Sequence, residues 1–123
     1  MEPIVGNLRR SFNTNLTKTR KWRVDQLNAL MRLIDENSNE LIAALKKDLN
    51  KHEHETITME FGVIKNGIVH ALNNIDKWMK PISSPPIFQA RPLYSTFIEH
   101  QPYGVVLIIG NSKSILFAFT LSF

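Results

Sequence analysis

Apolar residues recur at helical spacing through the first two thirds of the chain. Over residues 20–36, 38–49 and 55–79 they follow one another at steps of three and four, which places their side chains on one face of an α-helix. The pattern therefore predicts three amphipathic helices. In chain order, the apolar positions are Leu27, Leu30, Met31 and Ile34; Leu41, Leu45 and Leu49; and Ile57, Phe61, Ile64, Ile68, Leu72, Ile75 and Met79.

Local signals mark where these helices begin and end. Asn37 and Glu40, three positions apart, resemble a capping box at the start of the second helix. Pro81 lacks the backbone N–H that a helix needs and so ends the third helix. Residues 1–80 are therefore predicted to form a helical N-terminal region.

After residue 80 the helical period is lost. Prolines hold residues 81–92 in an extended arm, and alternating side chains over residues 94–99 predict a short strand with two usable faces. Residues 104–110 are an apolar run with glycine at both ends, as expected for a strand buried on both faces of a parallel sheet. Parallel neighbours require crossovers of a dozen or more residues, and thirteen residues follow Gly110. The sequence is therefore expected to begin an α/β domain without completing it.

The charge is mildly basic, with a formal net charge of +4. The densest basic run, residues 18–23, could bind nucleic acid or anionic lipid. However, apolar residues interrupt it and Asp25 follows at once. No recognised nucleic-acid-binding module accompanies the run, so no nucleic-acid partner is expected.

The sequence also bears on location. The N-terminus is polar and lacks the apolar core of a signal peptide, so a cytoplasmic location is expected. Residues 104–123 approach the length of a membrane span, but Lys113 would lie at the bilayer centre, at a cost of about 2.5–3.5 kcal/mol. A membrane partner is not expected for this chain.

The 123 residues contain no cysteine, which excludes a disulfide, a thiolate metal site and a cysteine nucleophile within them. His52 and His54, two positions apart, point in different directions, and no third ligand lies near in sequence. They are therefore interpreted as solvated histidines. Neither His70 nor His100 has a recognisable acid–base partner nearby in the sequence.

Two other patterns carry little chemistry. Ser112 and Ser114 flank Lys113, but neighbouring residues on an extended segment face opposite ways, so a serine–lysine pair is not predicted. Gly104 and Gly110 bracket the apolar run without a G-x-G-x-x-G motif. The sequence accordingly names no catalytic, cofactor-binding or metal-binding residue.

Four segments, in unbroken order between about residues 8 and 110, resemble the N-terminal part of the class 3 aldehyde dehydrogenases. That branch of the NAD(P)-dependent superfamily includes the fatty-aldehyde enzymes. The corner around Trp78 and the strand after Pro102 are fairly specific in combination. The segments are Trp22-Arg23, Leu45-Lys46-Lys47-Asp48-Leu49, Trp78-Met79-Lys80-Pro81 and Pro102-Tyr103-Gly104-Val105-Val106-Leu107-Ile108-Ile109-Gly110.

The resemblance implies a fold and an activity. It implies that Val105–Ile109 form the first strand of a dinucleotide-binding domain and that Ser95–Glu99 join a bridging sheet used in dimer formation. The parent family oxidises aldehydes, here of medium or long chain, to carboxylic acids with NAD(P). A thiohemiacetal on a cysteine forms first, and hydride transfer follows. The expected fold is thus an N-terminal fragment of an aldehyde dehydrogenase-like α/β fold, divided into residues 1–80 (helices), 81–103 (arm and bridging strand), 104–110 (first cofactor-domain strand) and 111–123 (a tail).

The match ends after Gly110, where the family continues with Pro-Trp-Asn-Tyr-Pro. Asn111 comes two positions too early to replace the asparagine of that segment, so its role is not transferred. The family's cysteine, glutamate base and phosphate-binding glycines would lie further along. A truncated, inactive dehydrogenase is therefore expected. The alternatives are a non-catalytic form that pairs with full-length subunits, or a basic helical interaction module unrelated to the enzyme.

Overall fold

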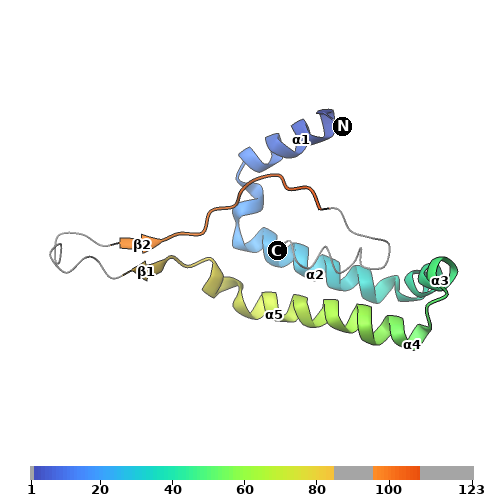
Figure 1. Ribbon diagram of the computed structural model, residues 1–123. Helices are drawn as coiled ribbons and strands as arrows, with labels where there is room; N and C mark the ends of the chain where they lie inside the picture. The colour runs from blue at the N-terminus through green and yellow to red at the C-terminus, as the bar shows by residue number, and fades with distance from the viewer. Residues whose placement is uncertain (1, 85–95, 109–123) are drawn as a thin grey trace.

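The computed structural model describes residues 2–84 and 96–108 (Figure 1). Over these residues the protein is mostly helical, with one two-stranded antiparallel sheet. The elements are α1 (Glu2–Asn13), the 3₁₀ turn η1 (Leu16–Lys18), α2 (Arg20–Glu36), α3 (Ser38–Leu49), α4 (Glu53–Glu55), the π-helix η2 (Thr56–Phe61), α5 (Gly62–Trp78), β1 (Ile82–Ser84) and β2 (Thr96–Ile98).

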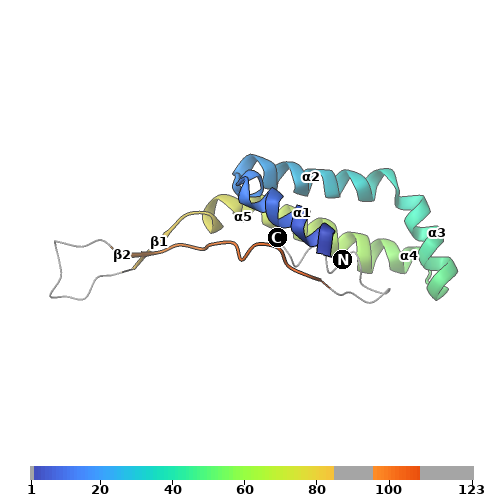
Figure 2. The same ribbon diagram turned by 90° about the horizontal axis from the view of Figure 1, so that it is seen from above.

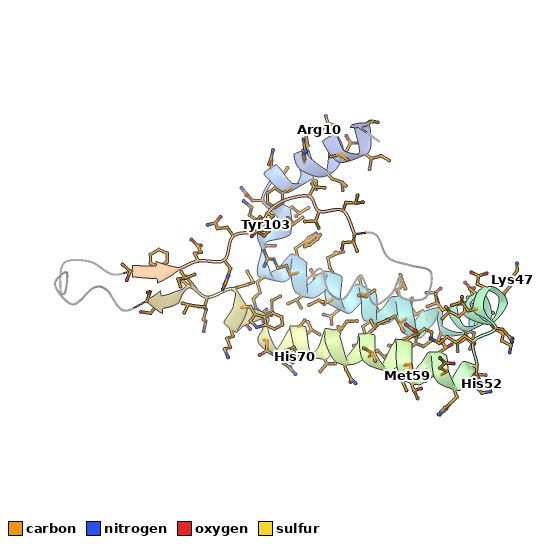
Figure 3. The ribbon with its side chains drawn as sticks, viewed as in Figure 1. Arg10, Lys47, His52, Met59, His70 and Tyr103 are labelled. Carbon is orange, nitrogen blue, oxygen red and sulfur yellow. The ribbon has the colours of Figure 1, made fainter. Side chains whose placement is uncertain are left out.

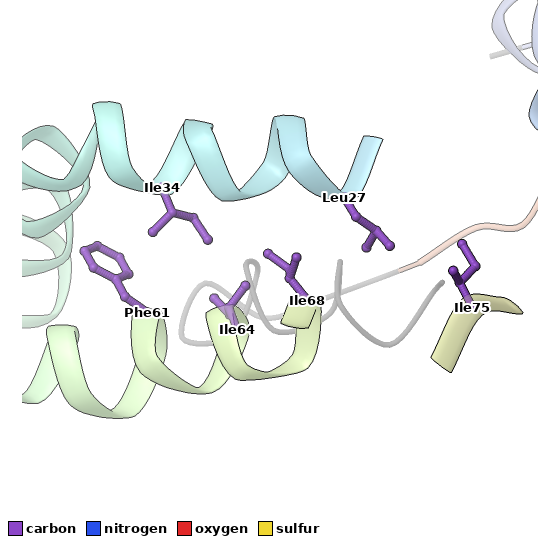
Figure 4. Close-up of a cluster of buried hydrophobic side chains, with 6 residues drawn as sticks. All are labelled: Leu27, Ile34, Phe61, Ile64, Ile68 and Ile75. Atoms are coloured by element: carbon purple, nitrogen blue, oxygen red, sulfur yellow. The ribbon is translucent and has the colours of Figure 1, made fainter. Parts of the chain in front are cut away.

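The core lies between α2 and α5, which run antiparallel side by side (Figure 1). Figure 4 shows its six buried side chains pointing toward one another between the two ribbons. Burying a large aliphatic or aromatic side chain contributes about 1.5–3 kcal/mol, so this contact is the main source of stability. The six are Leu27, Ile34, Phe61, Ile64, Ile68 and Ile75.

The predicted bounds of α2 and α3 are confirmed, and their apolar faces are the buried or half-buried ones. The capping box, however, does not form. The Asn37 side chain donates from Nδ2 to the Leu33 carbonyl oxygen at 2.8 Å and so satisfies the end of α2, while it makes no cap bond to α3. The first turn of α2 is capped by Thr19, whose hydroxyl oxygen accepts from the Trp22 backbone N–H at 3.3 Å.

The third predicted helix is present as a continuous helical run through α4, η2 and α5. The backbone keeps right-handed helical angles at Glu55, Phe61 and Gly62, where one segment passes into the next. The run ends at Trp78, ahead of Pro81, as predicted.

The π-helix changes which residues of this run face the core. In a π turn the backbone bonds join residues five apart, so side chains five apart share a face. Thr56, five before Phe61, is completely buried, whereas Ile57, four before it, is 45% exposed. The predicted stripe is therefore correct from Phe61 to Ile75 but wrong at Ile57. It is also wrong at Met79, which follows the last residue of α5 and is exposed.

A short ribbon extends from the end of α5. β1 pairs antiparallel with β2, with Ile82 opposite Ile98 and Ser84 opposite Thr96. The ribbon projects away from the helices in both views (Figures 1 and 2). β2 falls within the predicted strand Ser95–Glu99, whereas β1 was expected only as part of the extended arm. Residues 85–95, which include most of that arm, lie outside the described residues.

The expected strand at 104–110 is not formed over its described part. Residues 104–108 have no regular secondary structure, and Leu107 is 83% exposed. A strand buried on both faces requires strands beside it and layers above and below it, and the described residues place neither around this segment. Gly104 has a φ of +113° and lies against the Phe12 ring of α1, a backbone conformation that suits glycine. Ile109 and Gly110 lie outside the described residues.

Candidate functional site

Two of the histidine candidates, His52 and His70, lie far apart along the α4–η2–α5 run (Figure 3). His52 and His54 are both exposed at the start of α4. The Nδ1 atom of His52 accepts a hydrogen bond from the His54 backbone N–H at 3.1 Å, so His52 serves as the N-cap of α4. Within the part of the chain that the structure describes, no three histidine, aspartate or glutamate side chains gather as metal ligands.

The remaining sequence candidates are not brought together. His70 is exposed on α5, and its ring lies 5.6 Å from the Trp78 ring, centroid to centroid. His100 is exposed in the segment after β2. Gly110, Asn111, Ser112, Lys113 and Ser114 lie outside the described residues.

A hollow of about 390 Å³ lies between α3 and the start of α4. Its lining includes an amine, an imidazole and a carboxylate, from Lys46, His52 and Glu53, but no hydroxyl or thiol. The hollow is open to solvent and does not enclose a substrate. The lining residues are Asn39, Ile42, Ala43, Lys46, His52 and Glu53.

The strongest electrostatic interactions join helices to one another. Arg20 in the first turn of α2 donates through Nε and Nη2 to the carboxylate of Asp76 near the end of α5, the second bond at 2.9 Å. These hydrogen bonds hold the pKa of Asp76 below its usual value of 3.8, and the same contact raises the pKa of Arg20. Both side chains are more than half exposed, so the pair fixes the relative position of two helix ends and does not form a buried catalytic dyad.

A second pair connects α3 to η2. Lys51, just after α3, bonds to Glu60 of η2 and lies 3.8 Å from Glu55. Lys51 and Glu60 each keep only 14% of their side chains exposed. Lys65 of α5 bonds to Asp35 of α2 in the same way, across the helix pair. These ion pairs thus connect the helices of the described residues to one another.

Comparison with known proteins shows which proteins this chain is similar to. No protein-family model matches the chain. Over 108 residues, or 88% of its length, the chain is 37% identical to an aldehyde dehydrogenase of Craterostigma plantagineum. Over 107 residues it is 39% identical to aldehyde dehydrogenase family 3 member H1 of Arabidopsis thaliana. The chain is homologous to part of the family 3 aldehyde dehydrogenases.

The chain is also similar to a human aldehyde dehydrogenase. Aldehyde dehydrogenase family 3 member B1 of Homo sapiens is 36% identical over 113 residues, which is 89% of this chain. The resemblance inferred from the four sequence segments is therefore confirmed. The chain spans about a fifth of the length of these aldehyde dehydrogenases: 22% of the plant proteins and 24% of the human one.

Two features of the described residues were not predicted from the sequence. The first is β1, whose three residues are too few to show an alternating pattern. The second is α1 as a separate helix: it falls within the predicted helical region 1–80 but was not assigned, although its apolar residues at positions 4, 8 and 12 follow a helical spacing. Among the described residues, no helix is both long and apolar enough to cross a membrane.

Proposed function

We propose that this chain supplies the N-terminal helical part of a family 3 aldehyde dehydrogenase subunit and that on its own it does not oxidise aldehydes. The first part is supported by similarity over nearly nine tenths of the chain. The second part rests on one observation, which is that the 123 residues contain no cysteine. Oxidation through a thiohemiacetal needs a thiolate that adds to the carbonyl carbon and carries the substrate during hydride transfer.

The cofactor of the parent reaction, NAD(P), does not fit the described residues. A dinucleotide pyrophosphate binds where a strand leads into the N-terminus of a helix, since the backbone N–H groups there point at the phosphates. In this chain the corresponding segment, residues 104–108, is extended and exposed, without a paired strand. The part played by α2 and α5 is then to form a packed support, and medium- or long-chain aldehydes are substrates of the parent enzyme only.

A second candidate function is pairing with full-length subunits. The β1–β2 ribbon favours it, because the ribbon projects from the helices and exposes Phe97 and Ile98 at 61% and 54%. An exposed apolar ribbon of this kind can add to a sheet of another chain. In this role the chain would act without chemistry of its own.

Activity is tested by incubating the purified chain with a medium-chain aldehyde and either NAD or NADP, and following the absorbance of the reduced cofactor. A full-length family 3 enzyme serves as the positive control. We expect no turnover above a protein-free sample, and turnover that scales with the amount of chain would refute the proposal.

Pairing is tested by co-purification with a tagged full-length family 3 subunit. The variant Phe97→Asp should lose the interaction, because the ribbon face would then carry a charge. The matched variant Val69→Asp alters a similarly exposed apolar residue on α5 and should retain it. Equal recovery of both variants would exclude the ribbon as the contact.

A further inference from the structure

Helix α1 gathers its apolar side chains on one side. Ile4, Leu8 and Phe12 follow one another at intervals of four, and Val5 lies next to them. At about 100° per residue, these four occupy an arc of about 100° around the helix axis. The rest of the circumference carries polar residues, apart from Pro3 and Gly6. The helix is therefore strongly amphipathic.

This apolar face lies outside the core. Ile4 is 65% exposed and Leu8 is 50% exposed, and among the described residues the buried cluster and the side chains packed on it all come from α2 to α5. Figure 1 shows α1 separated from the α2–α5 pair and joined to it through η1, and Figure 3 shows Arg10 on this separate helix. Val5 and Phe12 are half-buried, and Gly104 lies against the Phe12 ring, so Ile4 and Leu8 form the exposed part of the face. Covering these two side chains would remove apolar surface from water.

The charged residues beside the apolar face of α1 indicate which kind of surface this face binds. Residues 2–19 contain three basic residues, Arg9, Arg10 and Lys18, and one acidic residue, Glu2 at the start of α1. Arg9 borders the apolar arc, about 40° beyond Val5. The Lys18 ammonium lies 5.0 Å from the centroid of the Phe12 ring, which brings positive charge to one end of the arc.

An amphipathic helix with basic flanks and low overall hydrophobicity has the properties of helices that lie in the plane of an anionic membrane surface. With twelve residues, α1 is about 18 Å long, too short to cross the roughly 30 Å hydrocarbon core of a bilayer. Nucleic acid would leave the apolar arc exposed to water.

We infer that α1 binds an anionic lipid surface, with Ile4 and Leu8 in the boundary of the acyl chains and Arg9 and Lys18 at the headgroup phosphates. The inference does not depend on aldehyde dehydrogenase activity. It also differs from a membrane span, because α1 lies along the surface.

The test is flotation of the intact chain with phosphatidylcholine vesicles, with and without phosphatidylserine. Each basic residue near an anionic surface strengthens binding about fivefold, so Arg9 and Lys18 together predict roughly a 25-fold preference for the phosphatidylserine vesicles. Ile4→Asn with Leu8→Asn should weaken binding by about tenfold or more, since two apolar side chains no longer enter the lipid. The control Val69→Asn, on α5, should bind like the unaltered chain.

Charge is tested separately. Arg9→Gln with Lys18→Gln should lower affinity for phosphatidylserine vesicles about 25-fold at low salt, whereas Lys46→Gln with Lys47→Gln, on α3, should change it far less. Circular dichroism without lipid should show equal helix content in all variants.

Four results would overturn the inference. Equal binding to both vesicle types would remove the role of charge. Undiminished binding by the α1 variants would place the contact elsewhere. Self-association that Leu8→Asn abolishes, without vesicle binding, would make a second copy the partner. Capture by an acidic helix-binding protein such as calmodulin, again without vesicle binding, would assign the face to a protein groove.

Discussion

Truncating Ile64 to alanine should destabilise the helical region more than any change on its surface. Ile64 is completely buried between α2 and α5. The substitution removes three carbon groups, at about 0.8 kcal/mol each, and leaves a cavity that the two helices can close only in part. The expected loss in free energy of unfolding is about 2–5 kcal/mol. A domain is typically stable by about 5–15 kcal/mol, and six buried side chains make a small core. We therefore expect Ile64→Ala to be partly unfolded at room temperature.

The assay is urea unfolding followed by circular dichroism, with Val63→Ala as the matched control. Val63 is the neighbouring residue on the same helix but is 41% exposed, so its truncation should cost less than about 1 kcal/mol. Equal losses for the two variants would mean that α5 does not pack on α2 through the face that carries Ile64. A loss below 1 kcal/mol for Ile64→Ala would refute the existence of a tightly packed core.

Three further outcomes follow from contacts at the surface. Asp76→Asn should lower the thermal midpoint at neutral pH, and the difference from the unaltered chain should shrink as pH falls below about 3.8. The depressed pKa of Asp76 means that its stabilisation is complete above the unfolded value of 3.8 and is lost as the folded carboxylate protonates; Glu36→Gln, the control, should show no such convergence. Lys51→Met should cost about 1–3 kcal/mol in urea unfolding because it leaves the half-buried Glu60 carboxylate unpaired, whereas adding Glu60→Leu should restore most of the loss. Deleting residues 104–123 should reduce self-association in sedimentation velocity, because the exposed run Val105–Ile108 can pair with other chains, and an intact chain that stays monomeric at tens of micromolar would contradict this.

The positions of the helices were the part of the fold that the sequence predicted best. In this sequence the apolar residues that become buried also recur at helical spacing. The apolar steps match the buried face of α2 and the half-buried face of α3, so sequence alone located both helices and their ends. Within α4–η2–α5 it was harder to predict which side chains face the core. An α-helical wheel places Ile57 on the core side, and only the π turn at Thr56–Phe61 moves it outward. The residue pattern contains no signal that predicts such a turn.

Elements that depend on distant partners were predicted poorly. β1 exists only because β2 pairs with it, and its three residues carry no strand pattern of their own. The apolar run after Tyr103 shows the opposite case, since its composition is typical of a buried strand but no strand lies beside its described residues. No candidate site was predicted from the sequence, and the groups that the structure does bring together, such as Arg20 and Asp76, are fifty-six residues apart in the chain.

The π-helix gives one continuous helix two separate registers. Its wider turn offsets everything before Thr56 by about one residue, or about 100°, relative to everything after Phe61. The π turn itself contacts α3 and bonds through Glu60 to Lys51, just after α3, while α5 contacts α2. A homologue that lacks one residue in this stretch could keep both docking surfaces simply by closing the π turn into an ordinary α-helical one. An alignment of such a pair should place its gap here, inside a helix, where gaps are normally penalised.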